Sequence, residues 1–376
     1  MDPPRPRHHA RPPRRRPPPG RRPRPPLPPQ GARRGRPALL QAHPDLHRAR
    51  LGFRDEEERG IPIDAPHRNY KDPLHKPEPR LRAERRVPRA LRVPPARGGA
   101  AGVHALLTLD ASGPDSDPAV IRSVLSRLTG SEADVLRDVF AFLMGGGSEV
   151  RRLVDRVTLL ASLASDRQCR DFATEMRTVR EPAEAYPGDP GIVTSLLLNR
   201  VTLRRGEALY LPAGNIHAYL HGLWIELMAA SDNVLRGGLT PKHVDVPELL
   251  DVLEFQAPPV PYLAPEHPAP GVELYRPDVP DFLLARIVPA TRDATAGDAG
   301  ASVVDVDGPA IVLCTAGSVT LRGAASTVEV GRGEAVFVTP DEGRIVVTGE
   351  GEAFLATTPA PVAGASADAD PDAAAA

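Results

Sequence analysis

The most informative segment of this chain is GEALYLPAGNIHAY, at residues 206–219. Its apolar residues run up to Pro212, and the Ala-Gly-Asn that follows is typical of a turn. The pattern predicts a β-hairpin-like arrangement in which His217 lies just past the turn. An isolated histidine on a strand is more often a half-buried structural residue than a metal ligand, so the interpretation depends on other candidate ligands.

Further candidate ligands occur in two segments near the start of the chain. In QAHP, Gln41 and His43 are two residues apart, so in an extended strand their side chains point to the same face. In HKPE, Glu78 follows Lys76, and the proline between them keeps the backbone extended. With His217, these residues offer an amide oxygen, a carboxylate and two imidazoles. This is a plausible ligand set for zinc that leaves a position for substrate or water.

These segments resemble the type I, zinc-dependent mannose-6-phosphate isomerases of the cupin superfamily. The spacing of glycine, proline and histidine in residues 206–217 is that of the second cupin motif, whose histidine binds a divalent metal. The resemblance continues through residues 60–62 and 69–73 and is nearly unbroken from 186 to 253. It implies a carbohydrate-metabolism enzyme, on the route to GDP-mannose, that interconverts D-mannose 6-phosphate and D-fructose 6-phosphate.

The resemblance also implies roles for individual residues. One zinc ion per chain would be bound by Gln41, His43, Glu78 and His217. The residues implied to act in catalysis are Arg236, Lys76 and Glu226. The residues implied to bind the substrate are Lys242, Tyr219 and Asp232. A solvated pair of loop residues is the alternative interpretation of Arg236 and Lys242.

The reaction requires these residue types. An aldose and a ketose interconvert by moving a proton between C1 and C2 through an enediol, so negative charge develops on two adjacent oxygens. Zinc can polarise the carbonyl, a cation such as Arg236 can stabilise the enediolate, and Lys242 suits the substrate phosphate. The base remains open between Glu226, Lys76 and a zinc-bound water. The chain has three lysines, Lys71, Lys76 and Lys242, and all lie within the motifs named above.

The implied fold is mainly β, with two cupin-like β-barrels or jelly rolls and an inserted α-helical lobe. We expect metal-ligand strands at 39–78, the helical insertion at 105–180, the catalytic cupin at 181–264 and a metal-free cupin-like domain at 265–362. Asp117 as N-cap before Pro118 predicts one helix. Apolar spacing predicts a second at 135–143 and a third from Ser148. The segment GEAVFVTP (333–340) echoes GEALYLP (206–212) without a later histidine, which predicts a degenerate internal repeat.

Three segments do not fit this pattern. Residues 1–38 are rich in proline and arginine without apolar periodicity, so they read as aberrant or disordered, and they lack the apolar stretch of a signal peptide. Residues 79–104 form a second arginine-rich, aberrant segment, where the resemblance implies an apolar one. Residues 363–376 read as a disordered, alanine-rich tail. Translation out of frame would explain the arginine-rich segments, so the alternatives are an inactive remnant or a non-catalytic cupin sugar-binding module.

Composition indicates a cytoplasmic protein that acts on a small molecule. The chain has 376 residues and a net charge of −1, which favours neither nucleic acid nor a membrane as partner. Cys169 and Cys314 are too few for a disulfide framework and read as reduced thiols. No apolar run approaches the ~20 residues that a membrane span needs. We therefore expect a cytoplasmic monomer whose partner is a sugar phosphate.

Overall fold

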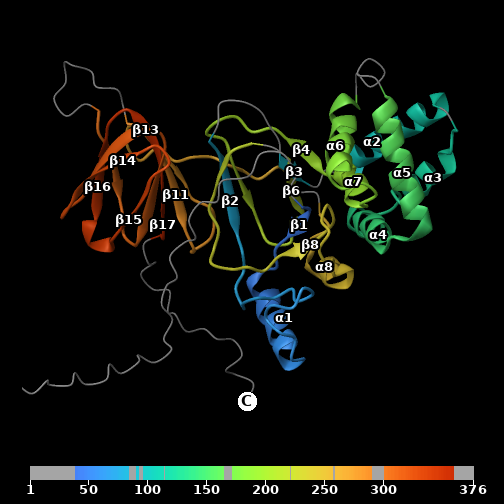
Figure 1. Ribbon diagram of the computed structural model, residues 1–376, viewed down its shortest axis with the longest axis horizontal. Helices are drawn as coiled ribbons and strands as arrows, with labels where there is room; N and C mark the ends of the chain where they lie inside the picture. The colour runs from blue at the N-terminus through green and yellow to red at the C-terminus, as the bar shows by residue number, and fades with distance from the viewer. Residues whose placement is uncertain are drawn as a thin grey trace, which may run out of the picture.

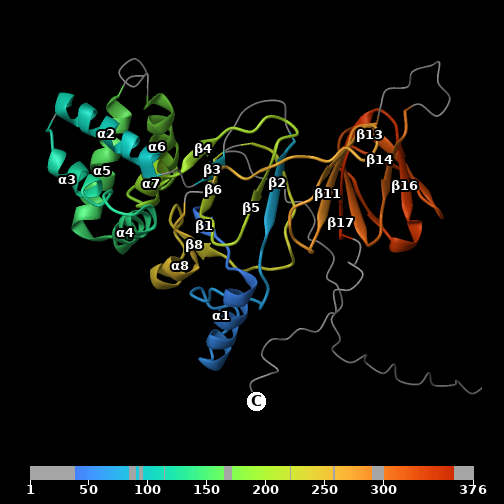
Figure 2. The same ribbon diagram turned by 180° about the vertical axis from the view of Figure 1, so that it is seen from behind.

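The computed structural model describes residues 39–83, 90–92, 96–113, 115–164, 172–220, 222–256, 259–289 and 300–359. A central pair of β-sheets lies between a helical lobe and a C-terminal β-unit, as Figure 1 and the reverse view in Figure 2 show. This arrangement confirms the expected fold of two β-units with an inserted helical lobe. The expected segments 1–38 and 363–376 lie outside the described residues. None of the described helices is long and apolar enough to span a membrane.

Two antiparallel sheets make up the central unit. The first has the strand order β4-β3-β6-β1-β8, and the second has the order β7-β2-β5-β9. The strands of the first sheet are β1 (Gln41–Ala42), β3 (Ala90–Arg92), β4 (Asn199–Val201), β6 (His217–Tyr219) and β8 (Leu235–Arg236). The strands of the second are β2 (Glu78–Arg82), β5 (Ala208–Leu211), β7 (Trp224–Glu226) and β9 (Tyr262–Leu263). Both sheets therefore combine strands from distant parts of the chain.

The turn between β5 and β6 crosses from one sheet to the other. β5 pairs with β2 and β9, whereas β6 pairs with β1 and β3. The expected hairpin between these two strands is therefore wrong. The two strands do not pair because both edges of β5 already have partner strands, so β6 forms its backbone hydrogen bonds in the opposite sheet. Gly214, with a φ of +74°, makes the turn and donates its N–H to His43 O (2.8 Å).

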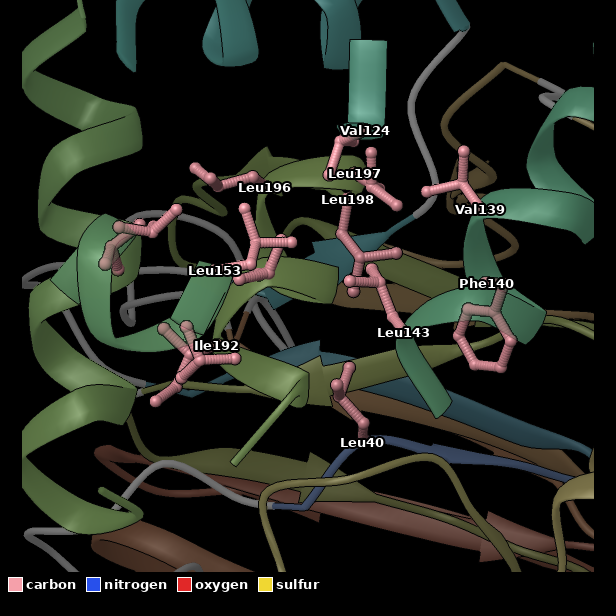
Figure 3. Close-up of a cluster of buried hydrophobic side chains, with 14 of the residues drawn as sticks. Leu40, Val124, Val139, Phe140, Leu143, Leu153, Ile192, Leu196, Leu197 and Leu198 are labelled. Carbon is pink, nitrogen blue, oxygen red and sulfur yellow. The ribbon is translucent and has the colours of Figure 1, made fainter. Parts of the chain in front are cut away.

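The outer face of the first sheet is apolar and packs on the helical lobe. Its outward residues belong to the core of that lobe: Leu40, Ala42, Ile216, Ala218 and Leu235. Figure 3 shows Leu40 in one cluster with Phe140 and Leu143 of helix α4 (Glu132–Gly145). Because side chains alternate along a strand, Gln41 and His217 point the other way, toward the second sheet.

The outer face of the second sheet packs on the C-terminal unit in the same manner. Leu81, Ala208, Ile225 and Leu227 share a core with Tyr275, Phe282, Leu284 and Phe354. Alternation then turns Glu78 and Arg80 of β2 toward the first sheet. The two flanking units thus cover opposite faces of the central unit, and the polar residues gather between its sheets.

The helical lobe confirms the helices expected from apolar spacing. Helix α3 (Pro118–Leu125) begins after Asp117, although the Asp117 side chain makes no capping hydrogen bond, and α5 (Gly147–Leu163) begins one residue before Ser148. The other described helical elements of the lobe are α2 (Ala96–Ser112), α6 (Ala173–Ala185), α7 (Gly191–Thr194) and the 3-10 helix η2 (Ser195–Leu197). Helices α1 (Leu46–Glu58) and α8 (Val246–Val252) belong to the central unit. The apolar spacing in the sequence predicted neither of these two helices.

The C-terminal unit is an eight-stranded sheet with the order β10-β11-β17-β13-β16-β12, in which β14 and β15 also pair with β13. Its first strands are β10 (Val272–Tyr275), β11 (Leu283–Ile287), β12 (Ser302–Asp305) and β13 (Ala310–Arg322). The others are β14 (Thr327–Gly331), β15 (Ala335–Val338), β16 (Arg344–Thr348) and β17 (Gly351–Thr357), and the 3-10 helix η3 (Pro340–Glu342) follows β15. β13 pairs with β15 through its first half and with β14 through its second, so it folds the sheet around an aliphatic core.

The two GEA segments adopt the same turn. Gly206 and Gly333 have φ of +86° and +88°, a conformation that favours glycine. In the first copy Glu207 Oε2 accepts the N–H of Arg204 (2.6 Å), and in the second Glu334 Oε2 accepts the N–H of Gly331 (2.8 Å). This shared geometry supports the predicted internal repeat.

The described part of residues 79–104 differs from the expected aberrant segment. It contains strands β2 and β3 and the first part of α2. β2 continues without a break from Glu78 to Arg82 and pairs with β5 on one edge and β7 on the other. Backbone pairing on both edges does not depend on the side-chain type, so Arg80 and Arg82 are held inside the central unit, 8 % and 1 % exposed.

Candidate metal centre

Three side chains from three strands or their ends converge between the two sheets. Glu78 Oε1 lies 3.3 Å from His43 Nε2, and Glu78 Oε2 lies 3.8 Å from His217 Nε2. One ligand atom from each of the three residues falls within 4.8 Å of the others, and all three residues are buried. Two imidazole nitrogens and a carboxylate at this separation are donors that suit zinc.

Backbone carbonyls orient both imidazoles toward this point. His43 Nδ1 donates to Asn233 O (2.8 Å), and His217 Nδ1 donates to Asn215 O (3.0 Å). Because a carbonyl can only accept, each ring carries its proton on Nδ1 and leaves the Nε2 lone pair free for a metal. Burial lowers the pKa of His43 and lowers that of His217 to about 3, so both rings are neutral at pH 7.

Gln41 completes the group and connects it to Arg236. The Gln41 amide nitrogen donates to His217 Nε2 (3.2 Å) and His43 Nε2 (3.4 Å), so the amide group lies between the two rings. In the sheet, Gln41 is directly opposite His217 on β6 and directly opposite Arg236 on β8. Residues opposite one another in antiparallel strands share a face. Arg236, Gln41 and His217 therefore form one row on the inner face of the first sheet.

Glu78 is the electrostatic centre of the cluster. Lys76 Nζ lies 3.7 Å from Glu78 Oε1, and Arg80 Nη2 donates to Glu78 Oε2 (3.1 Å). Burial alone would raise the pKa of Glu78, but attraction to His43 and His217 in their protonated forms and to the cations Arg80 and Lys76 outweighs it and holds the pKa well below its usual range. At pH 7, where both rings are neutral, Arg80 and Lys76 supply this attraction. Glu78 is thus an ionised, buried carboxylate, as a metal ligand must be.

Glu226 lies beside this centre. It is opposite Arg80 across β2 and β7 and forms an ion pair with the Arg80 guanidinium. Burial raises the pKa of Glu226 to about 7 although Arg80 opposes the shift, and the charge of Glu78 adds to it. A carboxyl group that titrates near neutral pH can both take up and release a proton during a reaction.

The residues expected to bind substrate lie at different depths. Tyr219 is buried, and its ring centre lies 5.4 Å from that of His217. Among the described residues its hydroxyl has no hydrogen-bond partner. Lys242 and Asp232 are exposed on loops, and within the described part of the chain no contact joins either side chain to the ligand cluster. Arg236 is half-buried, and burial lowers its pKa.

Three residues of the centre were missed by the sequence reasoning. Asn215 and Asn233 orient the imidazoles through backbone carbonyls, a role that leaves no side-chain signature. Asn233 also has a buried side chain that accepts from Lys71 N (2.7 Å) and donates to Leu74 O (2.9 Å). Arg80 carried a signal, because it follows the candidate ligand Glu78 by two residues and an extended strand places both on one face.

Known proteins establish the family. A mannose-6-phosphate isomerase of Escherichia coli (strain K12) is 34% identical over 317 residues, which cover 84% of this chain and 74% of that protein. The chain belongs to the mannose-6-phosphate isomerase family. The resemblance stated from the motifs is thereby confirmed, whereas no protein-family model matches the chain.

Solved structures of mannose-6-phosphate isomerases have the same fold. A mutant phosphomannose isomerase from Salmonella typhimurium matches with a TM-score of 0.73 and 29% identity, covering 86% of this chain and 76% of that one. A mannose 6-phosphate isomerase described as holo and zinc bound matches with a TM-score of 0.72 and 29% identity, over 86% of this chain and 76% of that one. In this chain, the described cluster of His43, Glu78 and His217 could hold a metal ion.

Proposed function

We propose that this chain is a zinc-dependent isomerase that interconverts D-mannose 6-phosphate and D-fructose 6-phosphate. The observation that carries the proposal is the convergence of His43, Glu78 and His217 from distant segments onto one buried point in a member of this family. A carboxylate and two neutral imidazoles held by backbone carbonyls are poor partners for one another but good partners for a cation.

Zinc suits the donor set. His43, His217, Glu78 and the amide oxygen that Gln41 can present by turning its side chain would hold one ion, and two imidazoles with a carboxylate are common zinc donors. When bound, zinc acts as a Lewis acid that polarises the sugar carbonyl. The order of the strands then places Arg236 next to Gln41, on the same inner face.

The protein side chains supply the remaining chemistry. Glu226, with a pKa of about 7, is the candidate that moves the proton between C1 and C2, and Lys76 is the alternative. Arg236 would stabilise the negative charge of the enediolate. Tyr219 would line the pocket floor. Lys242 and Asp232, on exposed loops, would bind the phosphate and hydroxyl groups at its rim.

A second candidate function is a sugar-phosphate-binding protein without turnover. One specific observation favours it: Arg80 pairs with both Glu78 and Glu226 and stacks on Tyr219, so a cation engages both the carboxylate ligand and the candidate that would move the proton. The two candidates differ in turnover, since both keep the ligand cluster.

A coupled assay tests the proposal. Purified chain supplemented with zinc should form fructose 6-phosphate from mannose 6-phosphate, and a chelator should stop the reaction until zinc is restored. His217→Ala is the matched control, since it removes one buried ligand and should show no chelator-sensitive turnover. Folded protein that binds mannose 6-phosphate without converting it would favour the second candidate.

A cytoplasmic location and a monomeric state complete the proposal. The scarcity of cysteine, with Cys314 buried and free, supports the location. Sedimentation of the purified chain at micromolar concentration tests the monomer, and a dimer mass would exclude it.

A further inference from the structure

A buried arginine occupies the acidic side of the ligand cluster. Arg80 follows Glu78 by two residues in β2, so both side chains point into the central unit. Its Nη2 donates to Glu78 Oε2 (3.1 Å) and pairs with Glu226. Its Cζ lies 3.1 Å from the centre of the Tyr219 ring. Two carboxylates and an aromatic ring therefore hold the guanidinium in place.

With Glu226 ionised, the described charges of the cluster balance one another. Glu78 and Glu226 are the two carboxylates, while Lys76 and Arg80 are two cations that face opposite oxygens of Glu78. A divalent ion bound to Glu78 must share that carboxylate with both cations. Repulsion between cations is much stronger in a buried site than in water. An arginine stays protonated at any working pH, so it cannot relieve the repulsion by losing a proton.

We propose that Arg80 is an internal counter-ion that competes with the metal ion for Glu78 and so weakens zinc binding. The inference rests on the proposed zinc site. Zinc must displace the Arg80 hydrogen bond or accept a guanidinium beside it, and Arg80 also couples Glu226 to Glu78 through one nitrogen atom. The chain should therefore bind zinc more weakly than its ligand set alone would allow.

Zinc affinity of neutral variants tests the role of Arg80. Chelator-stripped protein is titrated with zinc against a chromophoric chelator, and folding is followed by circular dichroism. Arg80→Met should bind zinc on the order of 100-fold more tightly than the unmodified chain. Arg80→Gln keeps an N–H donor for the carboxylates and should shift the affinity in the same direction, which secures the test if Arg80→Met does not fold.

The matched control is Arg82→Met. Arg82 is buried on the same face of β2, with its guanidinium 5.4 Å from the centre of the Trp224 ring instead of on Glu78. Its removal should leave zinc affinity within about threefold of the unmodified chain. A second readout is the rise in Tm on adding zinc, which should be larger in the Arg80 variants than in the unmodified chain or Arg82→Met, because ligand stabilisation grows with affinity.

Three results would overturn the inference. Equal zinc affinity in the unmodified chain and both Arg80 variants removes the counter-ion role while the zinc site stands. An equal gain in Arg82→Met assigns the effect to general positive charge and not to the place of Arg80. Failure of every folded variant and of the unmodified chain to bind zinc overturns the zinc site itself, and the role of Arg80 with it.

Discussion

Replacing Asn233 with alanine should weaken both the fold and the metal centre. Asn233 is 0 % exposed and joins His43 to the segment that leads to Lys76 and Glu78. Its side chain accepts from Lys71 N (2.7 Å) and donates to Asp72 O (2.7 Å) and Leu74 O (2.9 Å). Its backbone carbonyl accepts from the ring of His43.

The magnitude follows from these bonds. Each of the three lost hydrogen bonds leaves a partly buried partner and costs about 1–1.5 kcal/mol, so Asn233→Ala should lower the free energy of unfolding by about 3–4.5 kcal/mol. Displacement of the backbone carbonyl that orients His43 should weaken zinc binding by about 10–100-fold. Asn69→Ala is the matched control, because Asn69 is 9 % exposed and, among the described residues, its side-chain amide donates to Asp245 alone (2.8 Å).

Urea unfolding and zinc titration measure the two effects separately. Unfolding is followed by circular dichroism in excess chelator, so that bound metal does not contribute to stability. Asn69→Ala should lose about 1 kcal/mol and keep its zinc affinity. The reasoning is refuted if Asn233→Ala loses no more stability than Asn69→Ala, or if it binds zinc as tightly as the unmodified chain.

Two further expectations concern the centre and the helical lobe. His217→Ala should lose zinc and turnover together, whereas Arg236→Ala should lose turnover and retain zinc. Metal analysis and the coupled assay measure these two effects. Near-normal turnover in Arg236→Ala would contradict the role assigned to Arg236. Arg156→Met should lower the free energy of unfolding by about 3 kcal/mol, because Asp110, 0 % exposed, loses the Arg156 Nε partner at 2.5 Å. Arg151 is exposed on the same helix, and Arg151→Met should change the free energy of unfolding by less than about 0.5 kcal/mol in urea unfolding. Equal losses in Arg156→Met and Arg151→Met would argue against a stabilising Arg156–Asp110 pair.

Much of this protein could be inferred from local sequence. Apolar spacing and the Asp117–Pro118 start predicted helices in the lobe because both signals act within a few residues. The candidate ligands were recognisable because imidazole, carboxylate and amide groups occur at motif spacing. Helices α1 and α8 were not predicted: residues 46–58 lie between the quoted motifs, and residues 246–252 were interpreted only through the family resemblance.

The pairing of the strands and most of the contacts around the candidate metal ligands depended on residues that are distant in the sequence. The turn after β5 was expected to form a hairpin, yet β6 joins the opposite sheet because both edges of β5 are already paired. The same long-range pairing holds Arg80 against Glu226, and brings the Asn233 carbonyl to His43. Sequence by itself determined which donors the chain offers, since side-chain chemistry is local. Tertiary structure alone set their mutual distances and charges, because strand register and backbone acceptors arise only when segments far apart in the chain pack together.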